Sequence, residues 1–318
     1  MRKITKISTF LGMMVLGASL ILAQDPPAGQ GGRGGGGGRG GGGGAGGGGV
    51  AIKPVPNKAG LFMVTGAGGT STVRVTTEGV ILVDTKNPGE ANYNALLEQI
   101  KTVSPQPVKY AVVTHVHQDH AGNVDLFIKG GTQVVAHENM KKNWETYAPA
   151  AGKPMPNSTY TTPRTISLGG TQTIVQRFDN GHTSADSIVY FPDLRTIATG
   201  DHFAGAALNC DYAQGGSILG WAKALDAILK LDFDTVIAGH SNDPLTRADV
   251  QAAQARMAKI SSVAIDLVKK GTPMDQIVAQ VTAADSTLNL GALLQQTQAA
   301  NYAIRLPAFY AEVQAAAK

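Results

Sequence analysis

Cysteine is nearly absent from this chain, in which Cys210 is the only one among 318 residues. A single thiol cannot form an internal disulfide, so no disulfide framework supports the fold. It also excludes a structural zinc site that is closed by several thiolates. We expect Cys210 to fill space in the core as a small apolar residue, and a thiolate ligand to zinc is the less favoured alternative.

The chain also has little excess charge of either sign. Its 27 basic and 23 acidic residues give a formal charge of +4, and three of the basic residues, Arg2, Lys3 and Lys6, lie at the extreme N-terminus. Without these three the remainder carries only +1, so a strongly basic surface for a polyanionic partner is not expected. We therefore predict no nucleic-acid partner and a small-molecule substrate.

Residues 1–23 have the features of a secretory signal peptide. A basic start is followed by a mostly apolar run over residues 7–22, and Ala23 offers a small residue for cleavage. A transmembrane anchor is the alternative, but the apolar run is close to the lower length limit for spanning a bilayer. We expect cleavage without a stable membrane anchor, and hence a secreted or periplasmic mature protein.

Residues 24–50 form a glycine-rich tract that is interrupted by Arg33 and Arg39. A tract without apolar periodicity cannot bury a core, so we predict a disordered linker. The part that follows, residues 51–318, is long enough for one large α/β domain with a substantial core. We expect its core over residues 60–245 and a helical tail over residues 246–318.

Apolar runs bounded by glycine or proline predict strands over residues 61–65, 71–77, 80–84, 108–113, 133–136, 165–168, 171–178, 187–191, 196–199 and 235–238. Apolar residues at helical spacing predict helices over residues 90–102, 123–129, 138–147, 218–231, 247–270, 273–283 and 290–304, with a terminal turn at Pro307. The run 80–83 is apolar at every position, which is typical of a strand covered on both faces. This pattern predicts a strand-rich α/β fold.

Three histidines and an aspartate lie close together just after the predicted strand 108–113. His115 and His117 are two residues apart in extended chain, so their rings project to the same side and can hold one metal ion. Asp119 and His120 follow, and we expect Asp119 to cap the predicted helix 123–129. Imidazole and carboxylate are the usual ligands of Zn²⁺, so this segment predicts a metal site.

The segment resembles the signature of the metallo-beta-lactamase-fold hydrolases. Three later motifs continue the resemblance in the family's order, each after a predicted strand: Gly181-His182-Thr183, Gly200-Asp201 and Gly239-His240. The resemblance covers roughly residues 60–245. It implies a four-layer αββα sandwich, an α/β (α+β) architecture to which this chain adds C-terminal helices.

The resemblance also implies a ligand set for two zinc ions. One ion would be held by His115, His117 and His182, the other by Asp119, His120 and His240, and Asp201 would lie between them. A hydroxide shared by the two ions would attack the substrate, and Asp119 would orient it and carry a proton to the leaving group. Asp84, which ends the predicted strand 80–84, would steady one of the ligands.

The function implied is that of a secreted zinc-dependent hydrolase, beta-lactamase-like, that cleaves an ester, lactone or lactam bond. A secreted metal-binding protein of the same fold without turnover is the alternative. Asp201 is similar to the bridging carboxylate of lactonase-like members, whereas some beta-lactamases place a thiolate in this region. The bond that is cleaved stays open, because one fold supports many chemistries.

Two further histidines and one long connection complete the prediction. His137 lies at a junction between a predicted strand and helix, where we expect a surface or capping role. His202 follows Asp201, and alternation along extended chain turns it away from the metal ions. The segment 148–163 lacks periodicity and is long for a connection, so we expect it to line the substrate pocket.

We predict that a shortened protein beginning near Ala51 folds and hydrolyses substrate as the mature protein does, because the glycine-rich tract has no core-forming periodicity. Thermal unfolding and turnover of the two proteins provide the comparison. Loss of the cooperative transition or of turnover in the shortened protein would show that the tract packs on the domain.

Overall fold

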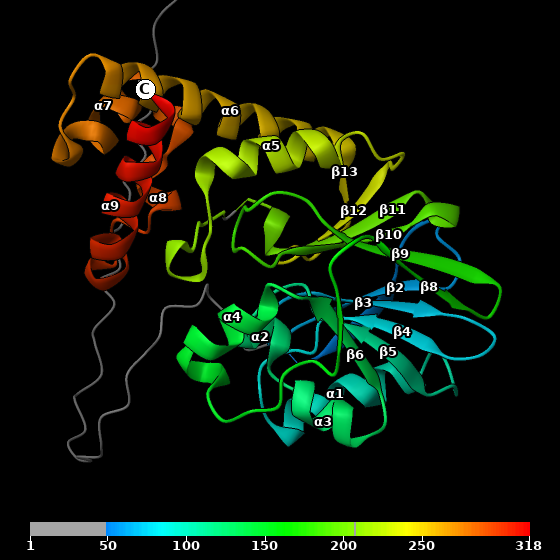
Figure 1. The fold of residues 1–318 in the computed structure, drawn as a ribbon. Helices are drawn as coiled ribbons and strands as arrows, with labels where there is room; N and C mark the ends of the chain where they lie inside the picture. The colour runs from blue at the N-terminus through cyan, green and yellow to red at the C-terminus, as the bar shows by residue number, and fades with distance from the viewer. Residues whose placement is uncertain (1–48, 207) are drawn as a thin grey trace, which may run out of the picture. The chain divides into compact units, whose positions relative to one another are not determined.

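The computed structural model describes residues 49–206 and 208–318. The predicted signal peptide and all but the last two residues of the predicted linker lie outside this part. Among the described residues the strands form two sheets, one of seven strands in the order β1-β2-β3-β4-β5-β6-β7 and one of six in the order β13-β12-β11-β10-β9-β8 (Figure 1).

The first sheet begins as an antiparallel meander and continues in parallel from β4 onward. Its strands are β1 (Ala51–Pro54), β2 (Leu61–Thr65), β3 (Ser71–Val75), β4 (Val80–Val83), β5 (Val108–Val112), β6 (Gln133–His137) and β7 (Ser158–Tyr160). The short edge strands β1 and β7 were not predicted. Val50, the last residue of the predicted linker, packs against the core behind this sheet, so the domain begins at or just before it.

The second sheet is antiparallel except for the parallel pair of β11 and β12. Its strands are β8 (Arg164–Leu168), β9 (Thr171–Arg177), β10 (Ser187–Phe191), β11 (Thr196–Gly200), β12 (Thr235–Ala238) and β13 (Leu245–Thr246). The hairpin of β8 and β9 turns at Gly169 and Gly170, both with positive φ, as the Gly-Gly signal indicates. All of these strands but β13 were predicted within one or two residues.

Helices cover the outer face of each sheet (Figure 1). The first sheet carries α1 (Glu90–Lys101) and α3 (Val124–Lys129), and the second carries α5 (Ile218–Ile228) and α6 (Arg247–Lys269). Short helices α2 (Gln118–Ala121) and α4 (Met140–Thr146) lie at one end of the first sheet. The described residues thus form the predicted four-layer αββα sandwich.

Alternation along the central strands explains why two sheets stack here. In β4, Val80 and Leu82 face the α1 side, while Ile81 and Val83 face the second sheet. In β10, Val189 packs between the sheets and Ile188 packs toward α5 and α6. Side chains of successive residues point to opposite faces, so a strand that is apolar throughout must be covered on both sides.

The C-terminal helices differ from the prediction. The expected helix 290–304 is two helices, α8 (Leu290–Leu293) and α9 (Ala299–Ala316), separated at Gln295 by a left-handed backbone with φ of 52°. Pro307 does not begin a terminal turn, as we expected, but lies inside α9. The burial of Leu306, Phe309 and Val313 offsets the free-energy cost of the backbone hydrogen bond that is lost at proline. The tail also holds α7 (Ile277–Ala284), and within the described ranges no helix is long and apolar enough to cross a membrane.

Substitution of Phe309 tests whether α9 packs on the domain as an integral part of it. Phe309 is fully buried, so we expect Phe309→Ala to lower the free energy of unfolding by about 3–5 kcal/mol. Ile304 on the same helix is 54% exposed, so Ile304→Ala should change it by only about 0.5 kcal/mol or less. Denaturant unfolding measures both, and equal small effects would mean that α9 is an independent appendage.

Candidate metal centre

The two sheets bring seven predicted ligands together at one end of the sandwich. They form two groups, each with potential ligand atoms within 4.8 Å of one another: His115, His117, His182 and Asp201 in the first, and Asp119, His120 and His240 in the second. His115 and His117 follow β5 of the first sheet, whereas His182, Asp201 and His240 follow β9, β11 and β12 of the second. Both sheets therefore contribute to both groups.

The segment after β5 turns directly into a helix. His117 is the N-cap of α2, and Asp119 and His120 lie within this single helical turn. Our expectation that Asp119 caps the next helix is wrong, because α3 begins after Asn123. This turn of helix places Asp119 and His120 in the second group, whereas His115 and His117 belong to the first.

Distances within the first group match those between the ligands of one cation. His117 Nδ1 lies 3.1 Å from His115 Nε2 and 2.9 Å from His182 Nε2. Asp201 Oδ2 lies 4.0 Å from His115 Nε2 and 3.7 Å from His182 Nε2. Ligand atoms at the usual bond length of about 2.0–2.1 Å from a tetrahedral zinc ion are about 3.3 Å apart. The distances between these four atoms lie on either side of that value.

The second group is equally compact. His240 Nε2 lies 3.3 Å from both His120 Nε2 and Asp119 Oδ2. Asp201 Oδ1 lies 3.2 Å from each of the two imidazole nitrogens. The carboxylate of Asp201 thus presents one oxygen to each group.

The environment of Asp201 fits a bound cation. The residue is 6% exposed, and the Nε2 atoms of His120 and His240, two of the predicted ligands, lie 3.2 Å from its Oδ1 atom. A buried carboxylate is costly unless a positive charge beside it compensates it. Oxygen and imidazole nitrogen atoms that converge at these distances are the donor set of a divalent metal site.

Asp84 orients ligands of both groups through hydrogen bonds, as predicted. Its Oδ2 atom accepts a hydrogen bond of 2.7 Å from His120 Nδ1, and its Oδ1 atom accepts one of 2.8 Å from the backbone of Thr114. The hydroxyl of Thr114 lies 2.9 Å from Asp84 Oδ2 and 3.0 Å from His115 Nδ1. These contacts leave Nε2 of His115 and His120 facing the site and fix both rings.

Two groups that orient ligands of the first group were not predicted from the sequence. Asp211 Oδ2 accepts a hydrogen bond of 2.8 Å from His117 Nε2, and the carbonyl oxygen of Asn209 accepts one of 2.8 Å from His182 Nδ1. Each leaves the other ring nitrogen free to face a metal ion. Both acceptors lie in an irregular segment far along the chain, where no periodicity or spacing links them to the histidine motif.

A buried lysine that sequence analysis also missed supports the loop over His120. The ammonium of Lys86 donates to the carbonyl oxygens of Val64 at 2.6 Å and of Gly69 at 2.7 Å. Burial lowers the pKa of Lys86 to about 7, although the charges of Asp84 and Asp119 oppose this shift. Gly69 in turn packs against the ring of His120, where a Cβ atom would lie only 2.2 Å from Cε1.

A second glycine explains the Gly-His motif after β12. A Cβ atom on Gly239 would lie 2.2 Å from Asp201 Oδ1 and 2.6 Å from the backbone of Gly200. Since Gly200 cannot give way at that distance, any side chain at 239 would displace Asp201 from its place between the groups. The glycine is required by the close approach of β11 and β12.

The remaining histidines and the cysteine stay out of both groups. His137 is buried, not at the surface, and its Nδ1 atom accepts a hydrogen bond from the backbone of Asn139. His202 turns away from the metal centre, as predicted, and bonds Asp186 at 3.0 Å. It does so from a 3-10 helix, Asp201–Phe203, and not from the extended chain that the prediction assumed. Cys210 is buried in the core cluster behind the second sheet, as expected.

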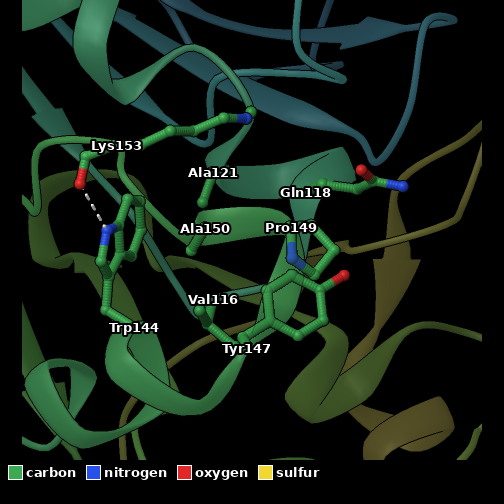
Figure 2. A pocket seen from close by; sticks show the side chains of 9 residues that line it. Val116, Gln118, Ala121, Trp144, Tyr147, Pro149, Ala150 and Lys153 are labelled. Carbon is green, nitrogen blue, oxygen red and sulfur yellow. Dashed lines mark hydrogen bonds between the residues drawn. The ribbon is translucent and has the colours of Figure 1, made fainter.

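The long connection after α4 packs on the histidine motif. Tyr147, Pro149, Ala150 and Lys153 line a hollow with Val116, Gln118 and Trp144, and the Trp144 indole donates to the carbonyl oxygen of Lys153 (Figure 2). The hollow has a volume of about 10 Å³, room for at most one water, so it cannot hold a substrate. The Tyr147 ring lies 5.3 Å from that of His117 and flanks the first group.

Comparison with known proteins places this arrangement in a family. Residues 64–240 match the sequence profile of the Metallo-beta-lactamase superfamily. A curated metallo-beta-lactamase from Chryseobacterium indologenes is 26% identical over 202 residues, which are 59% of this chain and 80% of that enzyme.

Solved structures share the fold. The metallo-beta-lactamase from Pontibacter korlensis superimposes with a TM-score of 0.58 at 23% identity, over 66% of this chain and 99% of that one. A stereoselective inverting sec-alkylsulfatase from Pseudomonas sp. superimposes with a TM-score of 0.64 at 20% identity, over 82% of this chain and 50% of that one.

Protonation differs between the two groups. Burial and neighbouring imidazoles lower the pKa of His115 well below its ordinary value, so this ring is neutral. Burial would also lower the pKa of His240, but hydrogen bonds from its ring to Asp119 and Asp201 outweigh it and raise the pKa to about 9. His120, buried among Asp201, Asp119 and Asp84, likewise has a pKa well above its ordinary value. The second group therefore holds protons at neutral pH.

Uptake of zinc by the second group should release these protons, because a ligand imidazole must be neutral. Its affinity should rise as the pH increases through about 9, the pKa of His240. Calorimetric titration of metal-free protein in buffers of different ionisation enthalpy measures the protons released. Equal affinity at neutral and alkaline pH with no proton release would contradict this assignment.

Proposed function

Since this chain belongs to the metallo-beta-lactamase superfamily, we propose that it is a zinc-dependent hydrolase whose two adjoining groups each bind one zinc ion. The single observation that carries the proposal is the carboxylate of Asp201, which presents Oδ2 to the first group and Oδ1 to the second. The ligands would be the seven predicted residues: His115, His117, Asp119, His120, His182, Asp201 and His240.

Zinc in such a site lowers the pKa of a bound water to near neutrality and polarises the bond under attack. The residues of the chain then hold, orient and move protons. Asp119 is only half-buried at the open side of the second group, so it is placed to take the proton of the attacking water and deliver it to the leaving group. No serine nucleophile is required.

For the substrate we propose a small molecule with an ester, lactone or lactam bond. The relatives named above as metallo-beta-lactamases support this choice, and the absence of a cysteine at position 201 favours the lactonase-like ligand pattern. A sulfate ester is a second candidate, because the alkylsulfatase structure superimposes on a larger share of this chain than the lactamase structure does. The features of residues 1–23 support export to the periplasm or beyond.

A substrate panel combined with metal analysis tests the proposal. Zinc-loaded protein would be offered a chromogenic lactam, a lactone, an aryl ester and a secondary alkyl sulfate. We expect turnover of at least one, loss of turnover with a chelator, and recovery on return of zinc. Two bound zinc ions without turnover of any compound would instead favour a metal-binding protein that has no catalytic activity.

Replacement of Asp201 separates a bridging ligand from a turn residue. We expect Asp201→Asn to retain about one zinc ion and to lower kcat/KM by a hundredfold or more. This corresponds to a free energy of activation that is higher by about 3 kcal/mol. Asp119→Asn provides the reference for a damaged second group, and the exposed Asp226→Asn provides a neutral control. Unchanged zinc content and turnover in Asp201→Asn would show that the carboxylate does not join the two groups.

A further inference from the structure

The C-terminal helix α9 contacts the segment that carries Asp211. The carboxylate of Glu312 accepts a hydrogen bond of 2.6 Å from the Tyr212 hydroxyl and another from the Ser217 hydroxyl. Arg305 lies about two helical turns before Glu312 on the same face of α9, and its Nη2 atom is 3.8 Å from Asp211 Oδ1. Two charged side chains of α9 therefore face both ends of the segment 211–217.

Asp211 connects this helix to the first metal group. Its Oδ1 atom faces Arg305 and also accepts a hydrogen bond from the backbone of Ala213, while its Oδ2 atom is bonded to His117 Nε2. The opposite nitrogen of that ring, Nδ1, is the atom that faces His115 and His182. A continuous path of contacts thus runs from α9 to a predicted zinc ligand.

The burial of Arg305 gives this path its physical weight. The residue is 6% exposed, and among the described residues Asp211 is the only carboxylate with which it forms an ion pair. Its Nη1 atom has no hydrogen-bond partner in the described part of the chain. A guanidinium in this environment is costly unless a fixed negative charge lies beside it, so Arg305 and Asp211 constrain each other's position.

We propose that Arg305 and Glu312 are positioning residues of the metal centre, through which α9 fixes Asp211 and thereby the ring of His117. Glu312 holds Tyr212 and Ser217, and Arg305 sets the carboxylate of Asp211 against His117. The inference rests on the proposed function, which makes His117 a zinc ligand. Both residues lie beyond residues 64–240, the part that matches the superfamily, so the helical tail is part of the site in this chain.

Zinc affinity of the full chain tests the inference. We expect Arg305→Gln, which removes the charge but keeps a polar side chain, to weaken the binding of one zinc ion about tenfold to a hundredfold. Arg305→Lys should recover part of this loss, and Glu312→Gln should weaken binding in the same direction. Competition with a chromogenic chelator measures affinity, and the visible spectrum of the cobalt-substituted protein should change in Arg305→Gln.

Tyr310→Phe is the matched control on α9. It removes the hydrogen bond of 2.7 Å from the Tyr310 hydroxyl to the carbonyl oxygen of Thr272, a contact that holds α9 to the tail and does not lead to the metal centre. We expect it to lower the thermal stability of metal-free protein while zinc affinity and the cobalt spectrum stay as in the wild type. A merely structural role of Arg305 would make both variants behave alike.

Two results would overturn the inference in distinguishable ways. If Arg305→Gln and Glu312→Gln bind both zinc ions as tightly as the wild type, the inference fails while hydrolysis by the wild type still supports the proposed function. If the wild type takes up no zinc, the proposed function fails and the inference with it. Should Arg305→Gln not fold, the affinities of Arg305→Lys and Glu312→Gln decide the question on the same criteria.

Discussion

The placement of one buried carboxylate, that of Asp201, is the constraint on which the rest of the centre depends. Its two oxygens face different sets of imidazoles, so both sets must approach it within about one ligand spacing. That approach requires β11 and β12 to run side by side in parallel, with glycine at 239 where a side chain would strike the carboxylate. It also requires the other sheet to deliver His115 and His120 to the same point.

The sandwich meets this requirement through the core between its sheets. Ile81, Val83 and Val112 of the first sheet pack against Val189 and Ile237 of the second. This apolar layer sets the distance between the strand ends, because protein interiors are close-packed and resist compression. Contacts at the rim reinforce it: the backbone of Thr70 donates to the carbonyl oxygen of Gly239 at 2.7 Å, which joins the loop of one sheet to the ligand loop of the other.

Sequence alone was sufficient for the features that depend on local pattern. The central strands follow from apolar runs, and the metal site at residues 115–120 follows from the spacing of its histidines. The resemblance to the family, and not the local pattern, implied His182, Asp201 and His240. Asp211 and Arg305 could not be found in this way, because their importance arises only when a distant helix packs beside the first group. Pro307 misled the prediction for a related reason: the burial of one face of α9 outweighs a local preference to end the helix.

Two cations that share the Asp201 carboxylate would be visible in a crystal structure of the zinc-loaded protein. Anomalous diffraction from such crystals, recorded at the zinc absorption edge, tests this arrangement most directly. We expect two peaks about 3.5 to 4 Å apart, with Asp201 in contact with both. One peak should lie among His115, His117 and His182, and the other among Asp119, His120 and His240. A single peak, or a second peak away from Asp201, would contradict this arrangement.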